Sequence, residues 1–166
     1  MKYMNLVKIS TSLLMILSTQ LFADDVVTVK TIGLELARDL VSESITACRK
    51  MGYQVSAVVV DRNGNLRAAL RDDRASRFTL QIAEEKANAV ILSGTDSGAF
   101  RQNRGDIRPE LNHMKGIIIM QGGVQITASG SRIGALGISG APGGEKDEVC
   151  ALKAIENLEE RLQFAE

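Results

Sequence analysis

The chain has 166 residues, and its 20 lysine and arginine residues balance 20 aspartate and glutamate residues. This length fits one domain. Zero net charge and 4% aromatic residues leave neither the basic surface nor the stacking platforms that a nucleic-acid partner requires. A hydrophobic fraction of 45% against 24% charged residues is ordinary for a globular protein and argues against disorder.

The first 23 residues have the layout of a secretory signal peptide. Lys2 and Lys8 supply a basic start, and an apolar stretch follows that ends at Ala23, before two aspartates. Serine and threonine residues interrupt this stretch, so it falls short of the ~20 apolar residues of a membrane span. We therefore expect cleavage after Ala23, a mature domain of residues 24–166 with no stable membrane anchor, and a periplasmic or secreted location.

The expected location bears on the two cysteines, because a disulfide persists in an oxidising compartment. Cys48 falls near the end of the first predicted helix of the mature chain, and Cys150 falls near the start of the last. If these helices pack antiparallel, the two thiols meet and can form a disulfide. The alternative is a pair of unlinked, buried thiols that act as small hydrophobic side chains, and the sequence leaves both open.

Helices and strands alternate along the first half of the mature chain. Apolar residues at helical spacing predict a helix over residues 31–51. Residues 54–61 are β-branched and nearly all apolar, which predicts a central strand buried on both faces. Arg62-Asn63-Gly64-Asn65 predicts a tight hairpin turn, because Asn-Gly tolerates positive φ angles. A half-exposed strand then covers residues 66–71.

The second half begins with a predicted helix over residues 76–93, for which Ser76 is the expected N-cap. The polar residues 94–112 are predicted to form a long loop, of the kind that serves as a lid, a binding loop or an interface. Three strands are predicted next, at residues 116–120, 124–129 and 132–139, with Gly122-Gly123 as a second tight hairpin. The last helix opens near Glu145, because acidic residues suit the positive end of the helix dipole.

The predicted order is therefore α-β-β-α-β-β-β-α. Two-residue hairpins join antiparallel strands. We therefore predict an α+β fold with a single five-stranded antiparallel sheet flanked by helices, and not a Rossmann fold.

Four segments carry motifs that point to a family. They are Val58–Asp61 with the following Asn63-Gly64 and Arg71-Asp72, Ala83–Ala87, Gly122–Ile126, and the glycine-rich run from Ile133 to Ala151. Together they resemble the GlcG/HbpS-like haem-binding family, and a similar domain ends some PduO-type corrinoid adenosyltransferases. The resemblance covers essentially the whole mature chain.

The resemblance implies a PAS/profilin-like sheet with helices packed on it, assembly into homo-oligomers, and haem or another small molecule as the ligand or cofactor. It does not imply a settled enzymatic activity. Two departures from the family pattern bear on the pocket. Asp72-Asp73-Arg74-Ala75 replaces the family's Asp-Gly-Ala, and Gln125 occupies a position where the family has proline.

Common catalytic arrangements are missing from the sequence. A nucleophile–histidine pair has only His113 to build on, and no nucleophile elbow accompanies it. The chain has no phosphate-binding loop, and its three cysteine and histidine residues fall short of the roughly four ligands of a structural zinc site. These absences argue against common hydrolase, kinase and dehydrogenase chemistry.

Lys86 is the most informative candidate, because it lies on the apolar stripe of its predicted helix. A lysine there either extends its ammonium group to water or finds an anionic partner. In one interpretation Lys86 binds a ligand carboxylate, such as a haem propionate, with help from Arg71 or Arg74. In the other it forms a structural ion pair with Asp61 or Asp72.

His113 is the candidate axial ligand of a haem iron, and its alternative role is that of a solvated loop residue. Met114 and Met120 are alternative thioether ligands. The leading hypothesis is an exported protein that binds or senses haem, a related tetrapyrrole or another small ligand. The alternatives are an enzyme acting on a small carboxylate and an accessory subunit that docks a partner through its long loop.

Overall fold

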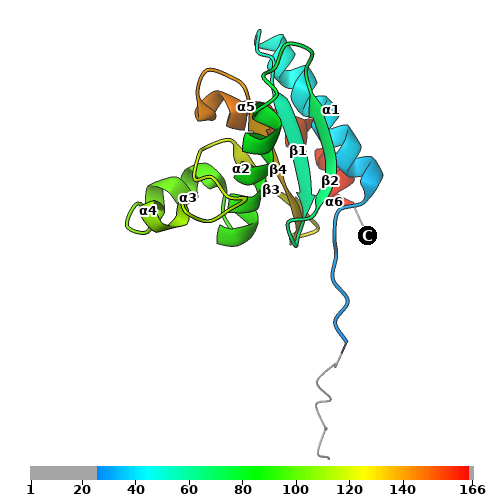
Figure 1. The fold of residues 1–166 in the computed structure, drawn as a ribbon. Coiled ribbons are helices and arrows are strands. Elements are labelled where there is room, and N and C mark those ends of the chain that lie inside the picture. The colour runs from blue at the N-terminus through cyan, green and yellow to red at the C-terminus, as the bar shows by residue number, and fades with distance from the viewer. Residues whose placement is uncertain (1–25, 165–166) are drawn as a thin grey trace, which may run out of the picture.

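The structure is a computed structural model that describes residues 26–164. The predicted signal peptide and its cleavage site lie outside the described residues. In chain order (Figure 1) the elements are α1 (Leu34–Lys50), β1 (Ser56–Asp61), β2 (Leu66–Arg71), α2 (Thr79–Ser93), α3 (Ser97–Asn103), α4 (Arg108–Leu111), β3 (Gly123–Ala128), β4 (Ser131–Ser139), α5 (Gly144–Asn157) and α6 (Glu159–Gln163).

The four strands form one sheet in the order β2-β1-β4-β3, and every neighbouring pair is antiparallel. The predicted α+β class and antiparallel sheet are thus confirmed, and so is the hairpin between β1 and β2. Successive side chains of a strand point to opposite faces. Ala57 and Val59 of β1 therefore pack into one core cluster, and Val58 and Val60 pack into another.

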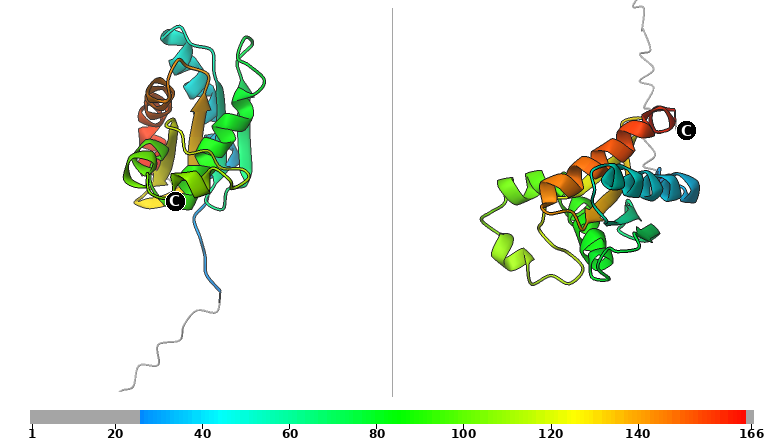
Figure 2. Two further views of the ribbon diagram at one scale, coloured as in Figure 1. Left: turned by 60° about the vertical axis from the view of Figure 1, so that its left-hand side comes forward. Right: turned by 90° about the horizontal axis from the view of Figure 1, so that it is seen from above.

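Helices cover both faces of the sheet. Helices α1 and α5 lie side by side on one face, and α2 crosses the other (Figure 2). A disulfide joins Cys48 of α1 to Cys150 of α5, with 5.3 Å between the two Cα atoms. It links the first and last large helices of the domain within the larger core cluster.

Helix α2 approaches the sheet closely because two glycines lie beneath it. Gly123 and Gly137 are opposite one another in the β3–β4 ladder. A Cβ atom on Gly137 would overlap the carbonyl oxygen of Ala83, and one on Gly123 would overlap that of Lys86. The paired glycines thus create the space that lets the backbone of α2 rest on the strands.

The prediction of a fifth strand at residues 116–120 was wrong. The predicted hairpin would have paired residues 116–120 with the outer edge of β3, and side chains at the start of α3 occupy that edge. The backbone N–H of Gly123 donates to Oγ of Ser97, and that of Gln125 donates to Oδ1 of Asp96, each over 2.8 Å. Residues 116–120 instead run along α2, where the N–H of Ile118 donates to the carbonyl of Glu85 over 3.4 Å.

Three local predictions also need correction. Gly122-Gly123 is not a hairpin, because residues 116–120 form no strand and Gly123 is itself the first residue of β3. The tight turn lies between β3 and β4 at Ser129-Gly130, where both φ angles are positive. Residues 94–112 contain α3 and α4 rather than a continuous loop. Helices α1 and α2 each begin three residues later than predicted. The N-cap of α2 is Phe78, because Ser76 forms a turn that bonds Thr79 instead.

None of the described helices is long and apolar enough to cross a membrane.

Candidate functional site

Lys86 is almost fully buried, with 1% of its surface exposed. Its ammonium nitrogen lies 2.7 Å from Oδ2 of Asp147 and 2.9 Å from the carbonyl oxygen of Ile138. The carboxylate of Asp147 also accepts the backbone N–H of Ala141 over 2.9 Å. The charges of Lys86 and Asp147 therefore neutralise each other inside the protein.

Gly122 lies against this ion pair with a φ of +118°. A Cβ atom there would come within 2.8 Å of Nζ of Lys86 and of Cβ of Asp147. Glycine is thus required twice at this position, for its backbone conformation and for the close approach of two side chains. The Gly122-Gly123 motif serves Lys86 and α2, rather than a turn.

Neither partner proposed from the sequence for Lys86 was right. Asp72 forms a two-pronged ion pair with Arg49 of α1, with N–O distances of 2.7 and 2.8 Å. Asp61 accepts hydrogen bonds from Asn63 and Asn65 in the hairpin turn. The sequence signal for the actual partner was Asp147 itself, an acidic residue in the first turn of α5, directly after the glycine-rich segment.

The other sequence candidates do not gather around Lys86. Arg71, at the end of β2, donates to the carbonyl of Ala75 over 2.6 Å. Arg74 is exposed, and its backbone N–H donates to the side chain of Gln54 over 3.1 Å. His113 is exposed in the segment after α4. The contacts of Lys86 and Arg71 and the exposure of Arg74 and His113 do not join these four residues, which the sequence hypothesis combined in one ligand site.

Burial raises the pKa values of two acidic side chains near Lys86. Burial raises the pKa of Asp147, and the attraction of Lys86 opposes this rise. Burial also raises the pKa of Glu148, whose Oε2 atom is buried without a hydrogen-bond partner. Glu148 lies against Gly98 of α3, where an added Cβ atom would come within 2.8 Å of that oxygen.

An open cleft of about 620 Å³ lies between α2, the helices α3 and α4, and the segment that follows α4. We call residues 112–120 the cleft loop. Two bonds hold this loop to α2: Asn88 donates through Nδ2 to the carbonyl of Gly116 over 3.0 Å, and Ile118 bonds Glu85 as described above. A volume of this size lies within the usual range of about 300–1,000 Å³ for small-molecule sites.

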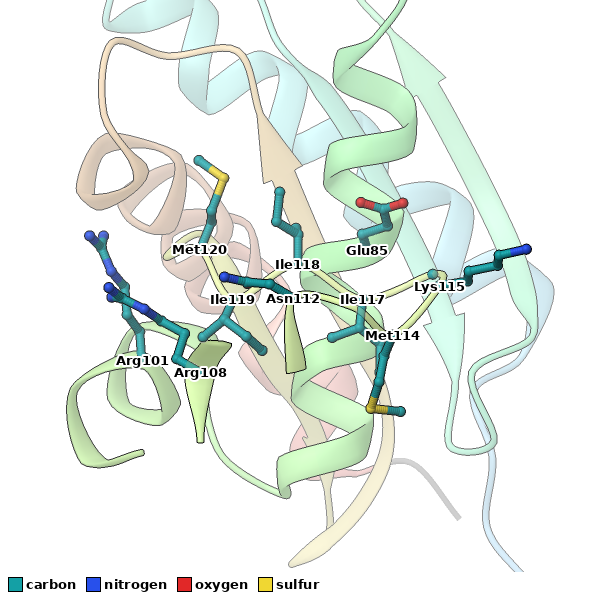
Figure 3. A pocket seen from close by; sticks show the side chains of 11 residues that line it. Glu85, Arg101, Arg108, Asn112, Met114, Lys115, Ile117, Ile118, Ile119 and Met120 are labelled. Carbon is teal, nitrogen blue, oxygen red and sulfur yellow. The ribbon is translucent and has the colours of Figure 1, made fainter. Parts of the chain in front are cut away.

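The polar lining of the cleft is mainly cationic. Arg101 of α3 and Arg108 of α4 extend at one end of the cleft, whereas Lys115 extends at the opposite end (Figure 3). Glu85 is the single acidic residue in the lining, and Asn112 adds an amide. Two neighbouring guanidinium groups favour an anion, and carboxylates suit their planar donor geometry.

The remaining lining is apolar and contains sulfur. Ile117, Ile118 and Ile119 supply branched aliphatic surface, and Met114 and Met120 lie on either side of this run. Both methionines are more than two-fifths exposed, at 45% and 41%, so their thioethers are accessible. His113 lies between two lining residues in the sequence and is not itself part of the lining.

The lining of the cleft suits the binding of an amphipathic anion. No cluster of three or more histidine, cysteine, aspartate or glutamate residues that could hold a metal ion occurs among residues 26–164. An amphipathic anion would place its apolar part on the isoleucines and its negative groups on the two arginines. The sequence analysis predicted a loop over residues 94–112, so it could not show that α3 and α4 present Arg101 and Arg108 together.

Comparisons with known proteins agree with the resemblance inferred from the sequence. The model of the family described as haem-degrading protein HbpS-like matches residues 32–156 of this chain. The GlcG protein of Escherichia coli K12 is 25% identical over 105 residues, which cover 63% of this chain and 78% of GlcG.

Solved structures show the same fold. A double mutant of Streptomyces reticuli HbpS aligns over 82% of this chain and 93% of that protein, with 28% identity and a TM-score of 0.76. The complex of PduOC with haem aligns over 76% of this chain and 94% of PduOC, with a TM-score of 0.66. Its identity is 21%, so this likeness concerns the fold.

Proposed function

Because this chain belongs to the HbpS-like family, we propose that it binds haem and that the cleft beside α2 is the binding site. Two findings support the ligand class: the family's description names haem degradation, and PduOC, which has the same fold, forms a complex with haem. The lining of the cleft supports this binding site, because it offers apolar surface for the macrocycle and cations for the carboxylates of haem.

The observation that carries the proposal is the pairing of Arg101 and Arg108 with the apolar cleft loop. Haem is a flat, largely apolar macrocycle that carries two carboxylates on one edge. Ile117 and Ile118, which are half-buried, would contact the macrocycle, and the two guanidinium groups at one end of the cleft would bind the carboxylates. The cleft thus separates apolar from cationic surface in the way that an amphipathic dianion requires.

Three side chains near the cleft are candidates for the iron. Thioether sulfur and imidazole nitrogen are both common axial ligands of haem iron. Met114 and Met120 are part of the lining, and His113 is adjacent to it in the sequence. We therefore rank the two methionines ahead of His113, which the sequence hypothesis had favoured.

Titration of the purified protein with haemin tests the proposal. A saturable shift of the Soret band at a ratio of one haem per chain is the expected result. Iron-free protoporphyrin is the matched control ligand, because it keeps the macrocycle and carboxylates and lacks the metal. Absence of any saturable spectral change with haemin would contradict the proposal. Following the band over hours separates stable binding from degradation.

We further propose that the mature protein is exported and works as a homo-oligomer. The layout of residues 1–23 supports export, and the disulfide between Cys48 and Cys150 is consistent with an oxidising compartment. Fractionation of cells that produce the full chain, with mass spectrometry of the N-terminus of the product, tests the cleavage after Ala23. Recovery of the uncleaved chain in the cytoplasm would contradict it.

A further inference from the structure

The residues that precede α1 form an extended segment with exposed apolar side chains. We call residues 26–31 the N-terminal segment. Five of its six residues are valine or threonine, and these residue types favour β-strands. Val26 is 82% exposed and Val27 is 77% exposed. Figures 1 and 2 show the segment running away from the body of the domain. It has the composition of a strand and no strand neighbour among the described residues.

The segment leaves the domain from a fixed point. Ile32 is buried, and its N–H donates to the carbonyl of Ile133 at the start of β4 over 3.0 Å. Arg62 of the hairpin turn contacts the carbonyl of Lys30 over 3.4 Å. Toward the N-terminus from these contacts, the side chains of Val29 and Val27 are exposed. The domain thus holds the base of the segment and presents the rest outward.

The sheet has an open edge at β2. This strand pairs with β1 alone among the described strands and ends the sheet. Its side chains Leu66 and Leu70 are 54% and 43% exposed. An open edge with exposed leucines is a template for another strand. The opposite edge, β3, is already occupied by the side chains of Asp96 and Ser97, so β2 is the edge that remains available.

The charges of the two features are complementary. Arg67 and Arg71 of β2 are exposed at the edge, and Asp24 and Asp25 precede the N-terminal segment in the sequence. Arg71, at the end of β2, attracts a strand that follows two acidic residues, whereas Lys30 lies at the other end of the segment, away from Arg71. Antiparallel pairing directs the acidic end of the segment toward Arg71 and its valines toward the leucines.

From these observations we propose that the N-terminal segment of one copy adds to β2 of a second copy as a fifth, antiparallel strand. The exchange is reciprocal, because each copy carries both features, and it therefore closes into a two-fold symmetric pair. The main-chain hydrogen bonds supply affinity. The valines add apolar surface beside the exposed leucines, Leu66 on one face of the sheet and Leu70 on the other. This proposal does not depend on the ligand of the cleft.

Cross-linking between two singly substituted chains tests the partner. Val27→Cys is mixed with Ala69→Cys, and a short bismaleimide is added without reductant, so that the disulfide of Cys48 and Cys150 protects the native thiols. We expect a cross-linked heterodimer in good yield. As the matched control, Lys153→Cys replaces Ala69→Cys, because the side chain of Lys153 is exposed on α5. This control should give little product. Absence of a heterodimer would overturn the proposal, and this is also the result expected if the segment folds onto β2 of its own chain. Equal yields with Ala69→Cys and Lys153→Cys would overturn it as well.

Sedimentation of a second set of variants tests the hydrogen bonding. Val27→Pro with Thr28→Pro removes two consecutive N–H groups, so one of them belongs to the pairing edge whichever register forms. Val27→Ala with Thr28→Ala keeps both groups and is the matched control. We expect the proline variant to dissociate at concentrations at least about tenfold higher than the alanine variant. Equal dissociation of the two variants would contradict strand addition.

Discussion

Lys86 and Asp147 join the two helical layers of the domain. The ammonium group of Lys86 in α2 lies 2.7 Å from the carboxylate of Asp147 in the first turn of α5, and both side chains are at most 4% exposed. Helices α2 and α5 cover opposite faces of the sheet, so the pair connects them past the end of β4, where Lys86 also bonds the carbonyl of Ile138. The resulting contact is structural, because neither charge reaches solvent.

Lys86→Met is expected to destabilise the fold by about 3–5 kcal/mol, because it leaves Asp147 buried without its cation. Urea unfolding at neutral pH measures this loss. The double variant Lys86→Met with Asp147→Asn removes both charges and keeps an acceptor for the N–H of Ala141. It should recover at least half of the loss. A single variant as stable as the wild type would show that the ion pair does not hold the layers together.

The sequence predicted that Lys86 either extends its ammonium group to water or meets an anionic partner, and it could not identify the partner. Position on an apolar helix stripe is a local property, which periodicity reveals. The identity of the partner depends on how α5 passes β4, which is a property of the whole fold. Asp61 and Asp72, the partners named from the sequence, are already satisfied by nearby polar groups in the hairpin and on α1.

Gly137→Ala is expected to lower the free energy of unfolding by at least about 2 kcal/mol, because overpacking forces backbone shifts. The added methyl group would overlap the carbonyl oxygen of Ala83, which is backbone and cannot rotate away. Gly105→Ala is the matched control, since nothing lies within 4 Å of its Cβ position, and it should change stability by less than about 0.5 kcal/mol. Thermal unfolding followed by circular dichroism compares the two. Equal melting temperatures would refute the close packing of α2.

The strand count shows where periodicity fails. Residues 116–120 are apolar in succession, which is typical of a buried strand and also of a segment packed along a helix. Residues 116–120 do not pair with β3, because the side chains of Asp96 and Ser97 accept hydrogen bonds from its outer N–H groups. Neither residue shows this role in its local sequence. Helices α3 and α4 were missed for a related reason, since short polar helices have no apolar stripe.

Removal of the disulfide is expected to cost about 3–5 kcal/mol in the free energy of unfolding. Cys48 and Cys150 are 102 residues apart, and in the chain-entropy model a closed loop of about 100 residues is worth roughly 4.7 kcal/mol. Cys48→Ala with Cys150→Ala and the wild type reduced with dithiothreitol should lose similar amounts. Urea unfolding measures both. A wild type that unfolds at the same urea concentration with and without reductant would contradict this role.

The ion pair of Arg49 with Asp72 makes stability dependent on pH in the acidic range. The hydrogen bond from Arg49 holds the pKa of Asp72 below its ordinary value of 3.8. A carboxyl group whose pKa is lower in the folded state stabilises the fold above its unfolded pKa, and this contribution disappears as the pH falls through the folded pKa. The stability difference between the wild type and Asp72→Asn should therefore be constant near neutral pH and shrink below about pH 4.

Urea unfolding at a series of pH values measures this difference. Repeating the comparison in an Arg49→Gln background is the matched control, because it removes the largest cause of the lowered pKa. The dependence on pH should then weaken. A difference between wild type and Asp72→Asn that grows as the pH falls would have the wrong sign for this assignment.

The double variant Arg101→Gln with Arg108→Gln is expected to weaken haem binding at least about tenfold. Each substitution would remove a charge-assisted hydrogen bond to a haem carboxylate. A loss of about 1.4 kcal/mol in the free energy of binding corresponds to a factor of ten in affinity. Arg67→Gln with Arg74→Gln is the matched control, because it removes the same charge from exposed positions outside the cleft. Haemin titrations should give the control variant nearly the wild-type affinity.

The same titration separates the cleft from the buried ion pair. Lys86→Met with Asp147→Asn should bind haem as the wild type does, because Lys86 is enclosed by Asp147 and Ile138 and does not line the cleft. If this variant lost binding while the Arg101 and Arg108 variant retained it, the carboxylates of haem would have to reach Lys86 after a rearrangement of α5. The ligand site would then lie at the glycine-rich end of β4, and the cleft loop would have another role.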